Sequence, residues 1–257
     1  MNKVLLAYVL SAGVLSAGAA AAVPALADAV PPAVAAALDS AGRPASDTAR
    51  DAARHPGQLI AFAGLKPGDT VADFVPGTGY YTRIFSALVG PAGHVAAIIP
   101  AELAAKLPKA APTIEAIAHA PGYGNVTTVV ESAAETARGL KLDAVWTSDN
   151  YHDIYGFFGA KTAAAADASI FAALKPGGVF VVIDHVGLPG SSDTAPTTLH
   201  RIDPETVKAQ VQAAGFVLEA QSDLLHNPAD THLDKVFIPA IKGHTDQFVF
   251  RFRKPAG

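Results

Sequence analysis

The strongest chemical signal in the sequence is a glycine-containing turn between an apolar strand and a helix. The strand reaches Asp73, and Pro76-Gly77-Thr78-Gly79 follows before the helix begins. Gly77 and Gly79 allow the backbone to approach a ligand where a Cβ would collide. The helix that follows directs its amide groups and its positive dipole end to the same place. We therefore expect a ligand site at this turn.

The turn departs from two common nucleotide-binding motifs. The dinucleotide fingerprint G-x-G-x-x-G needs a third glycine or alanine, and Thr82 occupies that position. A Walker loop needs Gly-Lys-Ser/Thr, which does not follow here. A plain strand-to-helix turn that binds nothing is the alternative interpretation of this segment.

A second group of chemically useful residues lies in the segment Ala144–Phe158, which begins with the fourth predicted strand and contains five aromatic residues. Its polar residues are Asp149, Asn150, His152 and Asp153. An apolar pocket with a few aimed polar groups suits a small substrate. We expect His152 to act as a base, because the ordinary pKa of histidine lies near neutrality. The alternative is that His152 and Tyr151 only pack beneath a loop.

The fifth predicted strand ends in Asp184-His185, which we also expect at the ligand end of the sheet. A Gly/Ser/Thr-rich loop, Gly187–Thr198, follows it and leads to His200. His152, Asp184 and His185 include the donor types of a two-histidine, one-carboxylate metal site. No tight spacing such as H-x-x-x-H supports that site, and no metal is expected. The candidate catalytic residues are therefore Asn150, Tyr151, His152 and His185.

These residues must be positioned by a regular alternation of strands and helices that begins after Gly64. The predicted strands are Thr70–Phe74, His94–Ile99, Asn125–Val130, Ala144–Thr147, Gly178–Asp184, Phe216–Gln221 and Gln247–Phe252. The predicted helices are Arg43–Phe62, Tyr81–Val89, Ala101–Leu107, Ala111–His119, Ala133–Arg138, Ala160–Ala173 and Pro204–Ala214.

This alternation indicates an α/β fold, a doubly wound and mostly parallel sheet with helices on both faces. Continuous runs of Val, Ile and Phe, such as Val179–Asp184, are typical of strands buried on both faces. The last strand follows a long irregular stretch without a crossover helix. We therefore expect that strand to be antiparallel.

The first 27 residues have the pattern of a signal peptide. Lys3 supplies a positive charge, Val4–Ala22 is apolar, and Ala25-Leu26-Ala27 matches a signal-peptidase site. We expect cleavage after Ala27 and export to the periplasm or the medium; a retained transmembrane anchor is the alternative. Residues 28–42 are rich in Ala, Pro and Val, and we expect a flexible leader there, before a single domain at residues 43–257.

Composition limits the classes of function. The chain has 257 residues, of which 50% are hydrophobic and 16% charged, and this excludes a disordered protein. A formal charge of −4 argues against nucleic-acid binding, and zero cysteine excludes disulfides and thiolate metal sites. No stretch after the signal peptide is long and apolar enough to span a membrane. We expect a small-molecule substrate, and nothing in the sequence indicates an oligomeric state.

Residues 73–82, DFVPGTGYYT, resemble the first motif of the class I S-adenosylmethionine-dependent methyltransferases. The resemblance extends over Arg43–Pro255. It includes LKPGDTVADF, LKPGGVFVVIDH and TDQFVFRFRKP, which are similar to segments of an exported bacterial branch of predicted methyltransferases. The resemblance implies a Rossmann-like sheet of seven strands with the last strand antiparallel. It also implies S-adenosylmethionine as the cofactor, lying over Gly77 and Gly79.

The resemblance further implies which residues bind the cofactor. These are Asp73, Pro76, Gly77, Thr78, Gly79 and Tyr80 of the first motif, Glu131 and Ser132 beside the adenine, and Asp149 and Asn150 after the fourth strand. The family has a further glycine at the position of Val75, and a ribose-binding acid at the position of Ile99. A missing carboxylate removes about 1.5–3 kcal/mol of charge-assisted hydrogen bonding, which weakens binding by about tenfold or more.

Three interpretations of function follow. The first is a methyltransferase that acts on a small molecule, with His152 or His185 near the acceptor. The second is a catalytically silent, exported binding protein on the same fold, which Ile99 and the export signal favour. The third is a nicotinamide-dependent reductase, which the missing third glycine disfavours.

Overall fold

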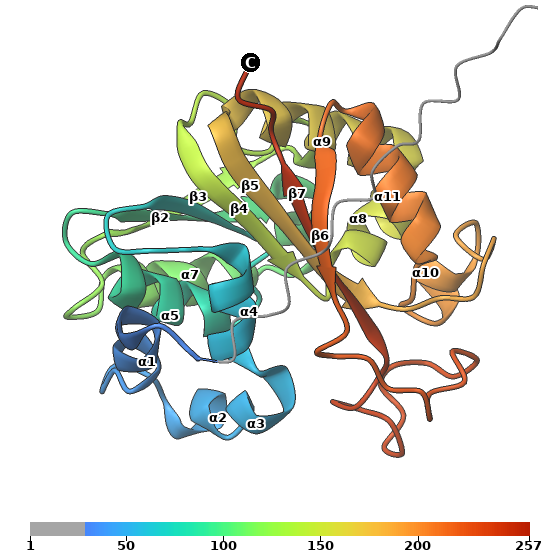
Figure 1. The fold of residues 1–257 in the computed structure, drawn as a ribbon, viewed down its shortest axis with the longest axis horizontal. Coiled ribbons are helices and arrows are strands. Elements are labelled where there is room, and N and C mark those ends of the chain that lie inside the picture. Colours follow the sequence, from blue (N-terminus) through green and yellow to red (C-terminus); the bar gives the residue numbers. More distant parts are fainter. Residues whose placement is uncertain (1–28) are drawn as a thin grey trace, which may run out of the picture.

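A seven-stranded sheet forms the centre of the computed structural model, which describes residues 29–257 (Figure 1). The strand order is β3-β2-β1-β4-β5-β7-β6. The strands are β1 (Thr70–Phe74), β2 (His94–Pro100), β3 (Val126–Glu131), β4 (Leu142–Ser148), β5 (Leu174–His185), β6 (Val217–Ser222) and β7 (Gln247–Arg253). The first five strands pair in parallel, and β7 runs antiparallel to both β5 and β6. The predicted fold class is confirmed.

Helices cover both faces of the sheet and bury two separate apolar clusters. One face is covered by α1 (Pro32–Leu38), α4 (Pro56–Ala63), α5 (Tyr80–Val89) and α7 (Ala110–Ala118), and the other by α8 (Tyr151–Phe158), α9 (Ala160–Ala173) and α11 (Pro204–Ala213). Val71 of β1 belongs to the first cluster and Ala72 to the second. Successive strand residues point to opposite faces, so the continuous apolar runs supply both cores.

The predicted helix over residues 43–62 is wrong, because the chain breaks it into three short pieces. These are α2 (Ala45–Thr48), α3 (Asp51–Arg54) and α4. His55 takes a left-handed conformation with φ 45°, and Pro56 then begins α4. A proline cannot donate the hydrogen bond that would continue the preceding helix. The break changes the direction of the chain next to the carboxyl ends of the strands.

Smaller differences between the predicted and the observed helices occur in the segments that connect the strands. The predicted helix at residues 133–138 is only a 3-10 turn, η1 (Ala133–Glu135), and Ala137 has a φ of 63°. Helix α6 (Ala101–Lys106) ends one residue earlier than predicted. The sequence patterns did not predict α8, nor α10 (Ala195–Thr198) within the Gly/Ser/Thr-rich loop.

The expected flexible leader at residues 28–42 contains a packed helix. Val34 is 0% exposed and Ala37 is also buried, and α1 packs against α4 and α5. The expectation is wrong for α1 because its apolar side chains face the first core cluster. The predicted signal peptide lies outside the described residues. Within residues 29–257, no helix combines the length and the apolar character needed to cross a bilayer.

The Val34→Ala substitution tests whether α1 is part of the folded domain. Removing two buried methyl groups should lower the free energy of unfolding by about 1–3 kcal/mol. Ala36 is exposed on the same helix, so Ala36→Ser should change stability by less than about 0.5 kcal/mol. Urea unfolding of both variants provides the measurement. Equal stabilities for Val34→Ala and the parent would mean that α1 is not held in the fold.

Candidate functional site

The glycine turn lies where the chain leaves β1 and begins α5, beside the end of β4. Gly77 has a φ of 59°, and a Cβ placed on it would meet no atom within 4 Å. Gly77 and Thr78 line a cavity of about 320 Å³ together with Asp149 and Asn150 from the end of β4. Open α/β sheets bind ligands at this kind of switch point between neighbouring strands. A cavity therefore lies beside the turn at which we expect a ligand site.

Gly79 plays a different part from the one we expected. It is buried at the start of α5, has a φ of 82°, and does not line this cavity. A Cβ at this position would overlap the side chain of Ile117 in α7. Glycine is therefore required at position 79 by backbone conformation and helix packing, whereas Gly77 faces open space.

Val75 also adopts a left-handed conformation, with a φ of 62°. A β-branched residue rarely adopts this conformation, which explains why the resembling family has glycine there. The Asn150 side chain donates a hydrogen bond of 3.1 Å to the carbonyl of Val75, and donates another to the carbonyl of Ser148. Asn150 lines the cavity but its amide N–H groups hold the turn, so its structural role is to join the loops after β1 and β4.

Asp73 is buried at the end of β1 and lines the same cavity. The Thr82 hydroxyl donates a hydrogen bond of 2.6 Å to its carboxyl group. Burial raises the pKa of Asp73 to about 7, although the hydrogen bonds with Thr82 oppose this change. Pro76 and Tyr80 also line the cavity, and the Tyr80 hydroxyl donates to Asp51 at 2.6 Å.

Two arginines from the broken N-terminal helix form a basic wall of this cavity, which the sequence patterns did not predict. Arg54 forms an ion pair with Asp149, and both side chains are about one-fifth exposed (20% and 22%). The Arg50 guanidinium lies 4.9 Å from the centre of the Tyr80 ring and forms no ion pair with the residues at 29–257. The sequence hinted at this pair only through the four-residue spacing of Arg50 and Arg54, and that spacing does not show where the segment that carries them packs.

A second cavity of about 430 Å³ adjoins the first and shares Arg50, Arg54 and Asp149 with it. Its other polar residues come from the start of α8, the end of β5, the loop before α11 and the segment before β7. They include His152, Asp153, His185, His200 and Thr245, and the apolar lining includes Val236 and Phe237. The structure thus brings the predicted His152 and His185 to one cavity, and adds His200.

Both ring nitrogens of His152 have partners, because Nδ1 contacts Asp184 and Nε2 contacts Asp153. Its Nδ1 lies 2.7 Å from Oδ1 of Asp184, and its backbone N–H donates to the other oxygen of the same carboxylate at 2.7 Å. Burial lowers the pKa of His152, but the charge of Asp184 and hydrogen bonds to Asp153 and Asp184 raise it to about 10. A doubly protonated imidazole cannot accept a proton. This charge state is unsuited to the base that we expected at His152.

His185 is in a different electrostatic state. Burial lowers the pKa of His185, and the charges of Asp149 and Asp184 only partly oppose this. Its Nδ1 lies 2.7 Å from the Thr245 hydroxyl. His185 is therefore neutral at physiological pH and has one nitrogen lone pair.

The expectation of a reacting Tyr151 is not supported, since its hydroxyl lies in the core. Tyr151 is 3% exposed, donates to Asp167 at 2.7 Å and accepts from Gln210 at 2.8 Å. It lines neither of the two cavities.

The residues expected at the adenosine end also lie outside both cavities. Ile99 is 2% exposed. Ser132 donates to Glu102 at 2.8 Å, and Glu131 accepts from the backbone of Ala137. Glu102 also accepts from the Ala133 backbone at 3.0 Å, so this nearby acid of α6 is already hydrogen-bonded to the segment after β3.

The two glycines of the turn should respond differently to substitution. Gly79→Val introduces a left-handed β-branched residue and overlap with Ile117, and should cost roughly 2–5 kcal/mol of stability. Gly77→Ala has free space and should cost only about 1–2 kcal/mol for its positive φ. Thermal unfolding measures both. A smaller loss for Gly79→Val than for Gly77→Ala would contradict the packing described for α5 and α7.

The raised pKa of Asp73 predicts a pH-dependent contribution to stability. A carboxyl group whose pKa rises from 3.8 to about 7 on folding stabilises the fold at acid pH, and this contribution is lost as the pH rises through about 7. The stability of the parent relative to Asp73→Asn should therefore be greater at about pH 5 than at about pH 8. Urea unfolding at the two pH values tests this. A constant difference would mean that folding does not raise the pKa of Asp73.

Comparison with known proteins agrees with this architecture. No family model matches the chain. Among curated proteins, a protein-L-isoaspartate O-methyltransferase of Ignicoccus hospitalis is 35% identical over 72 residues, which are 28% of this chain and 31% of that protein. The match thus spans about a third of the relative.

Solved structures match over most of the chain. A SAM-dependent methyltransferase from Aquifex aeolicus has a TM-score of 0.55 at 17% identity, covering 77% of this chain and 88% of its own. The cyclase SpnF has a TM-score of 0.59 at 19% identity, covering 85% and 86%. Identities this low establish the architecture only. The chain has the Rossmann-like fold of the class I S-adenosylmethionine-dependent methyltransferases.

Proposed function

We propose that this protein is an S-adenosylmethionine-dependent methyltransferase that acts on a small molecule. The observation that carries the proposal is the pair of adjoining cavities at the carboxyl ends of β1, β4 and β5, which meet at Asp149. Methyl transfer needs a donor and an acceptor held close and in line. One cavity has the turn that the fold uses for the cofactor, and the other has space for an acceptor.

The first cavity fits the methionine end of the cofactor. That end carries a carboxylate and a positive charge. Arg50 supplies a guanidinium with no ion pair among residues 29–257, and planar guanidinium groups bind carboxylates well. Asp149, whose pKa is held low mainly by Arg54 against the effect of burial, supplies a negative charge beside it. The exposed backbone of Gly77 and Thr78 allows close approach.

Fewer polar side chains are available to bind the ribose of the cofactor than to bind its methionine end. Ile99 replaces the acid of the resembling family, and Glu102 is engaged with Ser132 and Ala133. We therefore expect cofactor affinity to depend mainly on the methionine end. If the chain binds cofactor but transfers no methyl group, the catalytically silent binding protein is the better description.

When bound, the cofactor supplies the methyl group. The chain's own residues orient the acceptor and exclude water from it in the second cavity, with Val236 and Phe237 as apolar walls. If the acceptor atom carries a proton, His185 is placed to receive it, since it lines this cavity and a neutral imidazole can accept a proton. Asp149 lies between the two cavities, where its charge favours a cationic donor.

Calorimetric titration with S-adenosylhomocysteine tests cofactor binding. The parent should bind with one site per chain, and Arg50→Ala should bind roughly 10- to 150-fold more weakly, because it loses a charge-assisted hydrogen bond. Arg138→Ala is the matched control, since Arg138 is exposed and its ion pair is with Glu135, three residues away on the same exposed segment. Thermal unfolding verifies that both variants fold.

A titration without heat for S-adenosylhomocysteine and for S-adenosylmethionine would overturn the proposal. Equal affinities for Arg50→Ala and the parent would place the cofactor elsewhere. A second measurement follows conversion of S-adenosylmethionine to S-adenosylhomocysteine in the presence of a small-molecule extract. Binding without any conversion would favour the catalytically silent alternative.

A further inference from the structure

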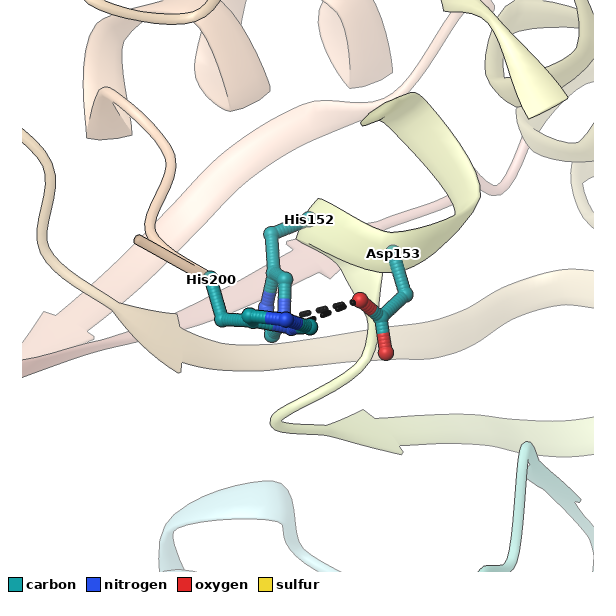
Figure 2. A group of neighbouring side chains, drawn as sticks. All are labelled: His152, Asp153 and His200. Carbon is teal, nitrogen blue, oxygen red and sulfur yellow. Dashed lines mark hydrogen bonds and ion pairs between the residues drawn. The ribbon is translucent and has the colours of Figure 1, made fainter. Parts of the chain in front are cut away.

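We propose that His152, Asp153 and His200 form a binding site for one divalent transition-metal ion in the wall of the second cavity. The three residues come from the first turn of α8 and from the loop that precedes α11 (Figure 2). Their candidate ligand atoms lie within 4.8 Å of one another. The proposal concerns binding alone, and it stands whether or not the protein transfers methyl groups.

The three ligand atoms form a nearly equilateral triangle. Nε2 of His152 lies 3.2 Å from Nδ1 of His200, and Oδ1 of Asp153 lies 3.1 Å from each of these nitrogens. With bonds of about 2.0–2.2 Å to an ion, these separations correspond to ligand–metal–ligand angles of about 90–105°. That is the geometry of three ligands on one face of a coordination sphere.

Chemistry supports a cation at this point. Nδ1 of His152 is occupied by Asp184, so its Nε2 faces the triangle, where it meets a carboxylate oxygen and another imidazole nitrogen. Without an ion, protons on the two histidines can pair these nitrogens with the Asp153 carboxylate, and a metal ion that binds here displaces the proton from Nε2 of His152. A proton can join only two of the three atoms, whereas a metal ion can bind all three. Two imidazoles and one carboxylate are the donors preferred by Zn²⁺, Fe²⁺ and similar ions.

A second shell supports the first ligand. Asp184 is 0% exposed, and it binds both the ring Nδ1 and the backbone N–H of His152. A carboxylate on the far nitrogen of a ligating histidine fixes the ring orientation and makes the imidazole a better donor. His200 is oriented by Phe237, whose ring centre lies 4.7 Å away. Its backbone is left-handed, with a φ of 56°, a conformation that histidine adopts more readily than most residues other than glycine.

The protein supplies three ligands on one side, and the opposite side is the 430 Å³ cavity. An ion here therefore keeps open positions for water or for an oxygen donor of a bound small molecule, as in catalytic rather than structural metal sites. If the proposed function holds, the acceptor occupies this cavity and can itself ligate the ion. His152 then serves as a metal ligand and is not free for proton transfer.

Metal titration of the full chain tests the site. The protein is produced without a polyhistidine tag, stripped with EDTA, freed of chelator, and titrated with Zn²⁺ by calorimetry. We expect one Zn²⁺ per chain. His200→Ala and Asp153→Asn should each weaken binding by more than the roughly 10–100-fold loss typical of removing a second-shell partner. Both residues are partly exposed, and circular dichroism verifies that the variants fold.

His226→Ala is the matched control. His226 is a half-exposed histidine that pairs with Asp246 at 2.9 Å, away from the triangle, so this variant should bind Zn²⁺ like the parent. Co²⁺ gives a second readout, because visible absorption bands report its coordination; they should appear for the parent and the control and be lost in the two triangle variants.

Two results would overturn the site. One is the absence of saturable Zn²⁺ binding to the parent. The other is equal binding by the parent and both triangle variants, which would mean an adventitious ion only. Because S-adenosylhomocysteine is absent from these titrations, failure of the proposed methyl transfer and failure of the metal site are separate outcomes.

Discussion

The site depends on one constraint of the sheet, which is that β1 and β4 are neighbours while the chain leaves them in opposite directions. After β1 the chain crosses to β2 and β3, and after β4 it crosses to β5 on the other side. Two parallel neighbours whose connections diverge cannot close the space between their carboxyl ends. The loops at Gly77 and Asp149 border that space. Arg54 pairs with Asp149 of one loop, and Asn150 joins the two loops through the carbonyl of Val75.

The space would be an open crevice without two segments distant in sequence. The broken N-terminal helix brings Arg50 and Arg54 over it, and its position is fixed because Val34 and its neighbours anchor α1 against α4 and α5. The segment before β7 closes the other side with Thr245, and the first residue of β7, Gln247, lies beside it. Figure 1 shows α2, α3 and this last segment at the same end of the molecule. The Arg54–Asp149 ion pair then lies where the two cavities meet.

The two proposals assign different roles to His152 and His185, which line the same cavity. His152 lies in the first turn of α8, just after the β4 loop, and Asp184 at the end of β5 fixes its ring. With Nδ1 fixed by a carboxylate, the ring presents Nε2 to a cation once its proton is displaced, whereas the protonated ring is a poor base. His185 follows Asp184 in sequence but is neutral, and its Nδ1 contacts the Thr245 hydroxyl and, at a longer distance, Gln247. Adjacent strand ends thus separate metal binding from proton acceptance within one cavity.

The sequence by itself determined the elements of the sheet and the ligand turn. The predicted β1 has the observed bounds Thr70–Phe74, and the other strands differ by a few residues, because apolar runs bounded by turn residues are local signals. Positive φ at Gly77 and Gly79 is likewise a local property. Only the tertiary structure decided which of these glycines faces a cavity, and that Tyr151 points into the core while His152, next to it, lines the second cavity. His152 and His200 are 48 residues apart and meet through packing of α8 against the loop before α11, and no local pattern encodes such a meeting.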